Sequence, residues 1–555
     1  MFEAVSAILN QGLSYIIPFI ILIGLLIFVH ELGHFLAAKF FNVKVETFSL
    51  GFGPKILKFI YGETTYCVSA LPFGGYVKMY GDEPGKDVPA ELKERSYLHK
   101  PVGQRIIVAL AGPLMNLFFA GLLFIFVAQI GDKALAPQIG EIARNSEAFQ
   151  NGFRPYDEIK KINGREVKTW DQVKEIIESS GNKKLNFEIA RLGDTKNLEV
   201  TPPSRANDNL FSTADRIGKV KGLHSRLHLP IVGVSYQSAL YEMGLRSGDQ
   251  IMEIDGESVK WFKDIEPSIF ESLNAGGGTA KIKVKRFKNF RNKDSGEELN
   301  FTLHAMNFKS QSLDLFFPEA VIAEVQEDSP AAAAGLLKGD RILSINDNPI
   351  VSFDDIITNV SSFKVDGPPL KIEIQRESQN QIFEIVPNMN SLEGQYGEKE
   401  NRFTIGVFPT LFSVPKTFLW KSPSMKEAVS RSFQQTKHWT NVTLLSFVRI
   451  FQNRVSSKNI SGIISIGQIA QQSWELGLNA FLKIMAIISI NLFILNLLPI
   501  PILDGGHLML FTLEAIKGAP ISLKKVEMAQ QVGFLIILFL MAFALFNDFS
   551  RIFGS

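Results

Sequence analysis

Four long apolar stretches divide the chain into two membrane-like ends and a polar middle. They cover residues 13–41, 105–130, 478–513 and 532–546. A helix needs about 20 residues to cross the ~30 Å hydrocarbon core at ~1.5 Å rise per residue. The stretches therefore predict four transmembrane helices. Residues 131–390 hold no such stretch, which predicts soluble modules inserted between the second and third helices.

The first apolar stretch contains His30-Glu31-Leu32-Gly33-His34. Charged and imidazole groups are expensive in lipid, so they indicate function. His30 and His34 lie one turn apart on a helix, where two ring nitrogens can converge on one Zn²⁺. Glu31 can then lie beside the ion and accept the proton of an activated water. The pattern predicts a zinc hydrolase site that needs a third protein ligand.

The third apolar stretch is interrupted by two prolines and two glycines within residues 499–507. Proline breaks a helix, so we expect unwound backbone here. At membrane depth such backbone occurs only where it is buried in protein or lines a water-filled cavity. Asp504 lies in this turn and is the expected third ligand, which leaves one position open for water. His507 is the alternative ligand.

Two further features allow two interpretations each. Asn116 lies in the second apolar stretch, where its amide needs a partner; it either packs between helices or lies near the metal site. Gly74-Gly75 lies within residues 42–100, where β-branched and aromatic runs are typical of short strands. These glycines either let another backbone come close or belong to an ordinary surface hairpin.

An internal repeat occupies the polar middle. Its copies begin at Gly152, Gly244 and Gly335, about ninety residues apart, and each continues into a Gly/Asp turn and an alternating strand. The pattern resembles the PDZ domain in its bacterial protease form. The first copy departs from it with Pro155-Tyr156, so its turn is expected to differ. None shows an obvious GLGF loop, so the modules either capture peptides or act as a spacer or steric gate.

The expected domains follow from these patterns. They are residues 1–131 with helices one and two and a β loop, PDZ-like modules at 136–203, 229–305 and 318–390, residues 391–475 as a linker with membrane-surface helices, and 476–555 with helices three and four. Residues 204–228 and 391–425 are interpreted as linkers because Asn, Ser, Gly and charges dominate them. Residues 420–457 mix aromatic and basic positions, which suits amphipathic helices on a membrane surface; an ordinary soluble helix is the alternative.

Composition narrows the class of protein further. The chain has 555 residues, 46% hydrophobic and 21% charged, with a net charge of +2. It shows no basic patch with interleaved aromatics, so we expect no nucleic-acid partner. Its single cysteine, Cys67, excludes an intrachain disulfide. Residues 1–14 carry no Lys or Arg and no A-x-A site follows, so the first stretch is not expected to be a cleaved signal peptide.

The basic residues predict an orientation. They cluster between the first and second helices (Lys39, Lys44, Lys55, Lys58, Lys100 and Arg105) and between the third and fourth (Lys517, Lys524 and Lys525). The positive-inside rule then puts both basic loops in the cytoplasm, and the PDZ-like modules and both termini outside. His34 precedes Lys39 by five residues, about 7.5 Å along a helix, so the site is expected toward the cytoplasmic side.

Together these motifs resemble the site-2 protease family of intramembrane zinc metalloproteases, in the form of the bacterial regulator-of-sigma-E proteases. The resemblance rests on HELGH (30–34), LPFGGYVKM (71–79), AGPLMN (111–116) and NLLPIPILDGGHL (496–508). It implies a multi-pass α-helical membrane protein with four transmembrane helices, a re-entrant β hairpin and an inserted array of three α+β PDZ-like domains. It implies an enzyme of the bacterial inner membrane with one Zn²⁺ held by His30, His34 and Asp504, and Glu31 as the general base.

The resemblance also implies a substrate and the residues that contact it. The substrate would be the transmembrane segment of a single-span protein, such as a pre-trimmed anti-sigma factor or a signal-peptide remnant, in regulated intramembrane proteolysis. Substrate contacts are expected from Gly74, Gly75, Asn116, Asn496, Pro499 and Pro501. Two features depart from the family pattern. This chain has a third PDZ-like module, and it has Ser461-Gly462-Ile463 where the family usually has SGP.

Two alternative functions differ in class. A membrane PDZ scaffold with a structural zinc would need four protein ligands, whereas the sequence offers three and a glutamate placed for catalysis. A zinc or peptide transporter would be expected to have more spans and a repeat among them. Both alternatives are therefore less well supported than the protease.

Overall fold

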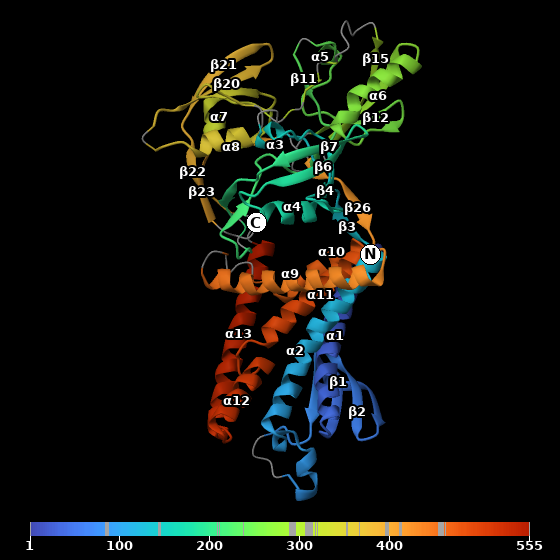
Figure 1. Ribbon diagram of the computed structural model, residues 1–555, viewed down its shortest axis with the longest axis vertical. Coiled ribbons are helices and arrows are strands. Elements are labelled where there is room, and N and C mark those ends of the chain that lie inside the picture. The colour runs from blue at the N-terminus through green and yellow to red at the C-terminus, as the bar shows by residue number, and fades with distance from the viewer. Residues whose placement is uncertain are drawn as a thin grey trace.

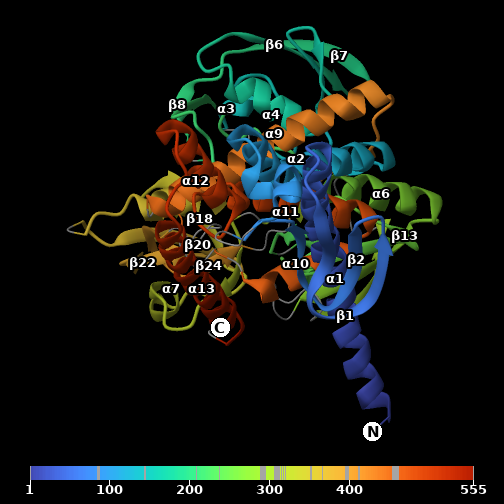
Figure 2. The same ribbon diagram turned by 90° about the horizontal axis from the view of Figure 1, so that it is seen from below.

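The computed structural model has a helical bundle at one end and α+β modules at the other (Figure 1). It describes residues 2–83, 88–142, 146–207, 209, 211–236, 238–287, 296–305, 313, 315–316, 318, 320–350, 353–365, 367–393, 399–409, 413–452, 455, 460 and 462–553. Seen from below, α1 with β1 and β2 lies on one side of the bundle, and α12 with α13 lies on the other (Figure 2).

Four helices in the described residues are long and apolar enough to cross a membrane. They are α1 (Phe2–Phe40), α2 (Val102–Ile130), α11 (Leu478–Asn496) and α13 (Leu523–Phe553). The helices pack through apolar side chains such as Leu22, Leu26 and Phe124, which are almost completely buried. The number of spans agrees with the prediction. Three of the helices extend beyond the predicted stretches because helix continues into the polar flanks.

The third stretch is interrupted where proline was expected to break it. Residues 497–503 are not helical, and α12 (Asp504–Lys517) begins directly after them. Glycine is required at the start of α12, because a Cβ on Gly505 or Gly506 would collide with backbone atoms of residues 497–501. The tight turn therefore places Asp504 at the first position of a new helix.

Two long strands follow α1 and form a layered sheet. Strand β1 (Val45–Tyr61) pairs with β2 (Thr64–Met79). Phe48 pairs with both Val77 and Tyr66, so the first half of β1 lies between two segments of β2. Gly51 and Gly53, with φ of 88° and 86°, occupy the reversal of β1. The expected short strands are thus parts of two long, bent ones, and residues 75–79 contact α1.

Three modules share one topology. The sheet orders are β5-β4-β6-β7, β13-β12-β14-β15 and β19-β18-β20-β21. The strands are β4 (Glu158–Ile162), β5 (Arg165–Glu166), β6 (Leu185–Arg191), β7 (Asp194–Val200), β12 (Gln250–Ile254), β13 (Glu257–Ser258), β14 (Thr279–Phe287), β15 (Gly296–His304), β18 (Arg341–Ile345), β19 (Asn348–Pro349), β20 (Leu370–Arg376) and β21 (Gln379–Ile385). The helices are α3 (Glu147–Gln150), α4 (Trp170–Glu178), α5 (Ala239–Glu242), α6 (Phe262–Ala275), α7 (Pro330–Ala334) and α8 (Phe353–Ser361). Each module has its own apolar core.

A buried ion pair explains the repeated Gly and Asp. The pairs are Asp157–Arg191, Asp249–Arg286 and Asp340–Arg376; in each, the guanidinium contacts both carboxylate oxygens at 2.7–2.8 Å. The same arginine donates to the carbonyl of the first glycine of its copy. The first copy was expected to have a different turn, but its backbone has the same left-handed conformation just before the aspartate. Tyr156 has φ of 70°, the left-handed conformation that Gly248 and Gly339 have at 96° and 94°.

The segments interpreted as linkers contain several short strands that pair with other parts of the chain, so they are not simple linkers. β24 (Val407–Pro409) pairs with β17 (Ile322–Val325), β25 (Ser413–Pro415) with β10 (Arg226–His228), and β26 (Thr417–Trp420) with β3 (Asp132–Leu135). β8 (Ser204–Ala206) pairs with β9 (Arg216–Gly218), β11 (Gly233–Val234) with β16 (Leu315–Phe316), and β22 (Asn388–Glu393) with β23 (Lys399–Thr404). The chain thus returns past the modules and leaves the array beside its entry strand.

Helix α9 (Met425–Phe451) crosses the module end of the bundle (Figure 1). Its polar side chains contact the bundle: Ser432 donates to the carbonyl of Gly121 at 2.6 Å, and Thr443 to Asn491 at 2.8 Å. Phe433 and Phe451 are exposed. That α9 lies on a membrane surface stays a prediction. The remaining helices are η1 (Ala90–Arg95), η2 (Tyr97–His99) and α10 (Ile463–Glu475).

Candidate metal centre

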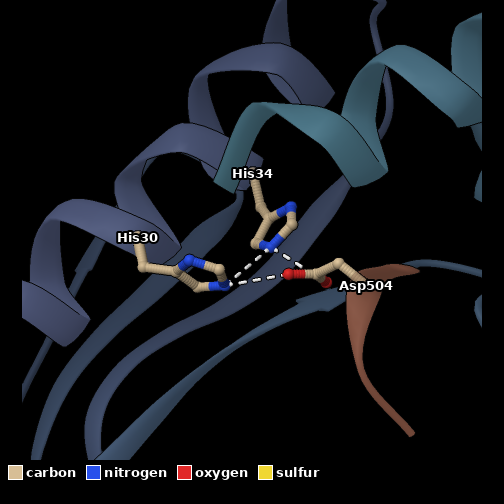
Figure 3. Close-up of side chains that lie close together, drawn as sticks. All are labelled: His30, His34 and Asp504. Carbon is tan, nitrogen blue, oxygen red and sulfur yellow. Dashed lines mark hydrogen bonds and ion pairs between the residues drawn. The ribbon is translucent and has the colours of Figure 1, made fainter. Parts of the chain in front are cut away.

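Three side chains from two helices meet inside the bundle (Figure 3). His30 and His34 project from one face of α1, with their Nε2 atoms 3.2 Å apart. Asp504 comes from the start of α12: its Oδ2 lies 3.1 Å from His30 Nε2 and its Oδ1 lies 3.3 Å from His34 Nε2. Residues 470 positions apart in the chain therefore share one site.

The spacing of these atoms fits a zinc ion. Tetrahedral coordination with bonds of about 2.0–2.1 Å places neighbouring ligand atoms about 3.3–3.4 Å apart. The two histidine nitrogens, 3.2 Å apart, are close to that value, and each has one of the two Asp504 oxygens at a similar distance of 3.1 or 3.3 Å. Two imidazole nitrogens and one carboxylate also form a ligand set typical of catalytic zinc, which keeps its fourth position for water or substrate.

Helix α2 orients both histidines although it carries no ligand. The Nδ1 of His34 lies 2.8 Å from the carbonyl oxygen of Val108. A carbonyl only accepts, so Nδ1 carries the hydrogen and Nε2 has its lone pair free for a metal. On the same helix, a Cβ added to Gly112 would collide with His34 Nε2. The glycine therefore leaves the space that the ligand occupies.

Asn116 performs the matching role for His30. Its amide lies 3.3 Å from His30 Nδ1, its side chain is fully buried, and its Oδ1 has no partner among the described residues. A metal on Nε2 makes Nδ1 a donor, which requires an oxygen opposite it. We therefore assign Oδ1 as the atom that faces His30, because the two ends of an amide are distinguished by their hydrogen bonds.

A cavity of about 700 Å³ opens at the site. His30, His34, Asp504, Glu31 and residues 75–79 line it. The Glu31 carboxylate accepts a hydrogen bond from the backbone N–H of residue 77, which holds it at the cavity wall. A carboxylate that is not part of the close ligand group thus lies beside that group and next to the strand segment of residues 75–79.

The amino-acid sequence also matches a known family. The profile of peptidase family M50 matches residues 18–540, which is most of the chain. The chain belongs to peptidase family M50. It is therefore a zinc metalloprotease, and its HExxH motif lies in a membrane-spanning helix.

Relatives cover nearly the whole chain. The "Regulator of sigma-E protease RseP" of Salmonella typhimurium is 31% identical over 96% of this chain and 98% of its own length. The protein of the same name in Escherichia coli K12 is 28% identical over the same shares. A relative in Pasteurella multocida, 28% identical over 96% of this chain and 98% of its own length, has "zinc metalloprotease" in its name. The similarity therefore includes the module array.

The M50 site brings together most, not all, of the residues that the sequence singled out. Gly75 and Asn496 line the cavity. His507 also lines it, but the close ligand group consists of His30, His34 and Asp504.

The other predicted substrate contacts are placed differently. Asn116 is fully buried behind His30, so the prediction that it contacts substrate is wrong. Gly74, Pro499 and Pro501 are not among the cavity-lining residues of the described chain. Gly74 packs against the ring of Phe52.

Sequence reasoning missed the supporting residues on α2 and α13. Val108 acts through its backbone, so no side-chain signal identified it. Gly112 lies within AGPLMN, but a glycine in an apolar helix gives no signal that it faces a ligand. Gln530 of α13 lines the cavity and lay just before the predicted fourth stretch. A polar residue at the edge of an apolar stretch was the available signal.

Proposed function

We propose that this M50 protease cleaves the transmembrane segment of a single-span membrane protein, such as an anti-sigma factor whose outer domain has already been removed, or a signal-peptide remnant. The observation that supports this best is the location of His30, His34 and Glu31 within α1, an apolar helix of membrane length, with Asp504 brought to them from the start of α12. A hydrolase site at that depth meets peptide bonds that lie in the membrane.

A substrate helix must unwind before it can be cut, because its amides are bonded internally. Residues 75–79 pair on one side with the start of β1 and line the cavity on the other. An extended peptide can add to such an edge, and its main-chain hydrogen bonds replace those of the helix. Gly75 lets a second backbone approach closely. Asn496, whose amide lies 3.5 Å from His30 Nδ1, is placed to hold a substrate carbonyl.

The chemistry then divides between the metal and the chain. When bound by His30, His34 and Asp504, zinc supplies the Lewis acid that activates water and polarises the scissile carbonyl. Glu31 accepts the proton of the attacking water and delivers it to the leaving amine. Val108 and Asn116 keep the two imidazoles in the orientation that leaves Nε2 toward the site.

We further propose a location in the bacterial inner membrane with the site toward the cytoplasm. His34 lies near the end of α1 that Lys39 follows, and α12 ends at Lys517, so both ligand-bearing elements meet basic residues at the same end of the bundle. The modules lie at the other end (Figure 1). Both termini and the modules are then outside.

The three modules, in this proposal, are PDZ-like domains that exclude substrates with large outer domains. The strands that begin and end the array, β3 and β26, pair with each other at the end of α2. The modules are thus fixed above the bundle by two chain connections. A substrate with a folded outer domain would meet them before its transmembrane segment reached the cavity.

The test is cleavage of a single-span reporter, trimmed of its outer domain, by the parent chain and by Glu31→Gln in detergent or liposomes. We expect the parent to cut within the span, and the variant to keep stoichiometric zinc while losing at least ~100-fold of the rate, the scale of general acid–base catalysis. Equal cutting by both would contradict the role of Glu31. No cutting across a panel of spans by a zinc-loaded parent would contradict the proposed function.

A further inference from the structure

Helix α12 carries the third ligand, yet the chain on either side of it is irregular. Residues 497–503 before Asp504 are not helical, and Gly518 ends the helix in the left-handed conformation with φ of 72°. Asp504 has no side-chain cap partner before it either. The tight turn sets where α12 begins, and contacts along the side of α12 set the direction in which the helix runs.

A buried ion pair provides that lateral contact. Arg105 Nη1 donates to Glu514 Oε2 at 3.0 Å, and Nη2 donates to Oε1 at 2.6 Å. Only 8% of the Arg105 side chain and 18% of the Glu514 side chain are exposed. The guanidinium Nε donates to the carbonyl of Lys100 at 3.0 Å. The contact is bidentate, so it fixes orientation as well as distance.

Aromatic rings close around this pair. The Arg105 guanidinium lies 4.9 Å from the centroid of the Phe511 ring. Tyr97 meets the same ring edge-on at 6.2 Å and donates its hydroxyl to the Arg105 carbonyl at 3.3 Å. The pair is thus shielded from water. A charge-assisted hydrogen bond is stronger in such a low-dielectric environment than in water.

Helical spacing connects the pair to the ligands. Asp504, Phe511 and Glu514 are separated by seven and three residues, so they lie along one face of α12. On α2, Arg105 is followed at three and seven residues by Val108 and Gly112, which contact His34. One face of α2 therefore orients His34 and also holds the helix that carries Asp504.

We propose that Arg105 and Glu514 are positioning residues that set Asp504 against the two histidines and so determine zinc affinity. This inference rests on the zinc site of the proposed function. Glu514 is ten residues from Asp504, about 15 Å along a rigid helix, so a tilt at Glu514 moves the ligand. Removing one partner leaves the other charge buried and unpaired, which favours such a tilt.

The experiment measures zinc dissociation constants by chelator competition and the absorption bands of the Co²⁺-substituted protein, using the purified full chain. For Glu514→Gln and Arg105→Gln we expect zinc binding about 10–100-fold weaker, the usual effect of losing a residue that supports a ligand. We also expect altered cobalt bands, because the ligand geometry changes. The double variant leaves no unpaired charge, so its loss should be smaller than the product of the two single losses.

The matched control is Asp132→Asn. It breaks the ion pair of Asp132 with Lys483, at 2.6 Å, near the module end of the bundle. We expect its zinc affinity and cobalt bands to equal those of the parent. A folded Glu514→Gln with zinc affinity within threefold of the parent and unchanged bands overturns the inference. If that variant does not fold, the double variant is judged by the same criterion. A parent that binds no zinc would instead overturn the proposed function.

Discussion

Replacing Gly75 with alanine should slow catalysis about 10-fold without removing the metal. A Cβ at this position would lie 2.9 Å from the carbonyl oxygen of Ser49, 3.0 Å from Ile27 Cγ2 and 3.1 Å from Glu31 Cγ. Optimal carbon–carbon contacts are about 3.5–4.0 Å, so Glu31 and Ile27 must each move by about half an ångström or more. The overpacking costs about 1–3 kcal/mol.

The loss of rate follows from the displaced base and the obstructed strand edge. A misplacement of about 1 Å costs about 100-fold in rate, so a shift of half that size should lower kcat by about 10-fold. The three nearest neighbours of the new methyl group belong to Ser49, Ile27 and Glu31 and not to the metal ligands, so zinc content should remain stoichiometric. The assay is cleavage of a trimmed single-span reporter, with zinc measured on the same sample.

Gly24→Ala is the matched control in the same membrane region. Nothing lies within 4 Å of a Cβ at Gly24, and alanine favours a helix interior by about 0.5–1 kcal/mol over glycine. Its activity should equal that of the parent. If Gly75→Ala retains the parent's rate within twofold, the close approach of this strand to Glu31 has no catalytic role and the reasoning is refuted.

Three further predictions concern other parts of the molecule. Gly112→Ala should displace His34 and weaken zinc binding at least 10-fold in chelator competition, whereas Gly121→Ala, with its nearest neighbour at 3.8 Å, should not. Asp340→Asn should destabilise the third module by about 1–3 kcal/mol, seen as faster proteolysis within it, because Arg376 loses its charge-assisted hydrogen bonds to the buried carboxylate. Burial raises the pKa of Glu141 to about 7. The folded chain then keeps a proton that the unfolded chain releases, so stability should fall between about pH 4.5 and 7 in thermal unfolding, and Glu141→Gln should remove that dependence.

The site was predictable from the sequence where its signals are local. His30 and His34 are one helical turn apart, and the prolines near Asp504 predict a break in the helix. Both signals depend on residues a few positions apart. The bundle likewise follows from apolar stretches of membrane length. The ion pair of Arg105 and Glu514 joins residues 409 positions apart, so neither local sequence revealed the other.

The module array shows the same limit. The Gly and Asp turn repeats in sequence because each buried aspartate must pair with an arginine, so three modules could be recognised. The strands along which the chain returns past the modules could not be recognised from the sequence. β24, β25 and β26 are three or four residues long, and their pairing depends on distant strands rather than on their own pattern. Tyr156 was likewise expected to need another turn, yet the surrounding module holds it with φ of 70°.

The most direct test of the account is to map the bond that the zinc-loaded chain cuts in a trimmed single-span reporter, by mass spectrometry of both fragments. The account predicts one or a few cuts inside the transmembrane segment, in its cytoplasmic half, abolished by chelation and restored by zinc. Cuts confined to the segments outside the membrane would contradict the central claim that His30, His34, Asp504 and Glu31 act on peptide bonds within it.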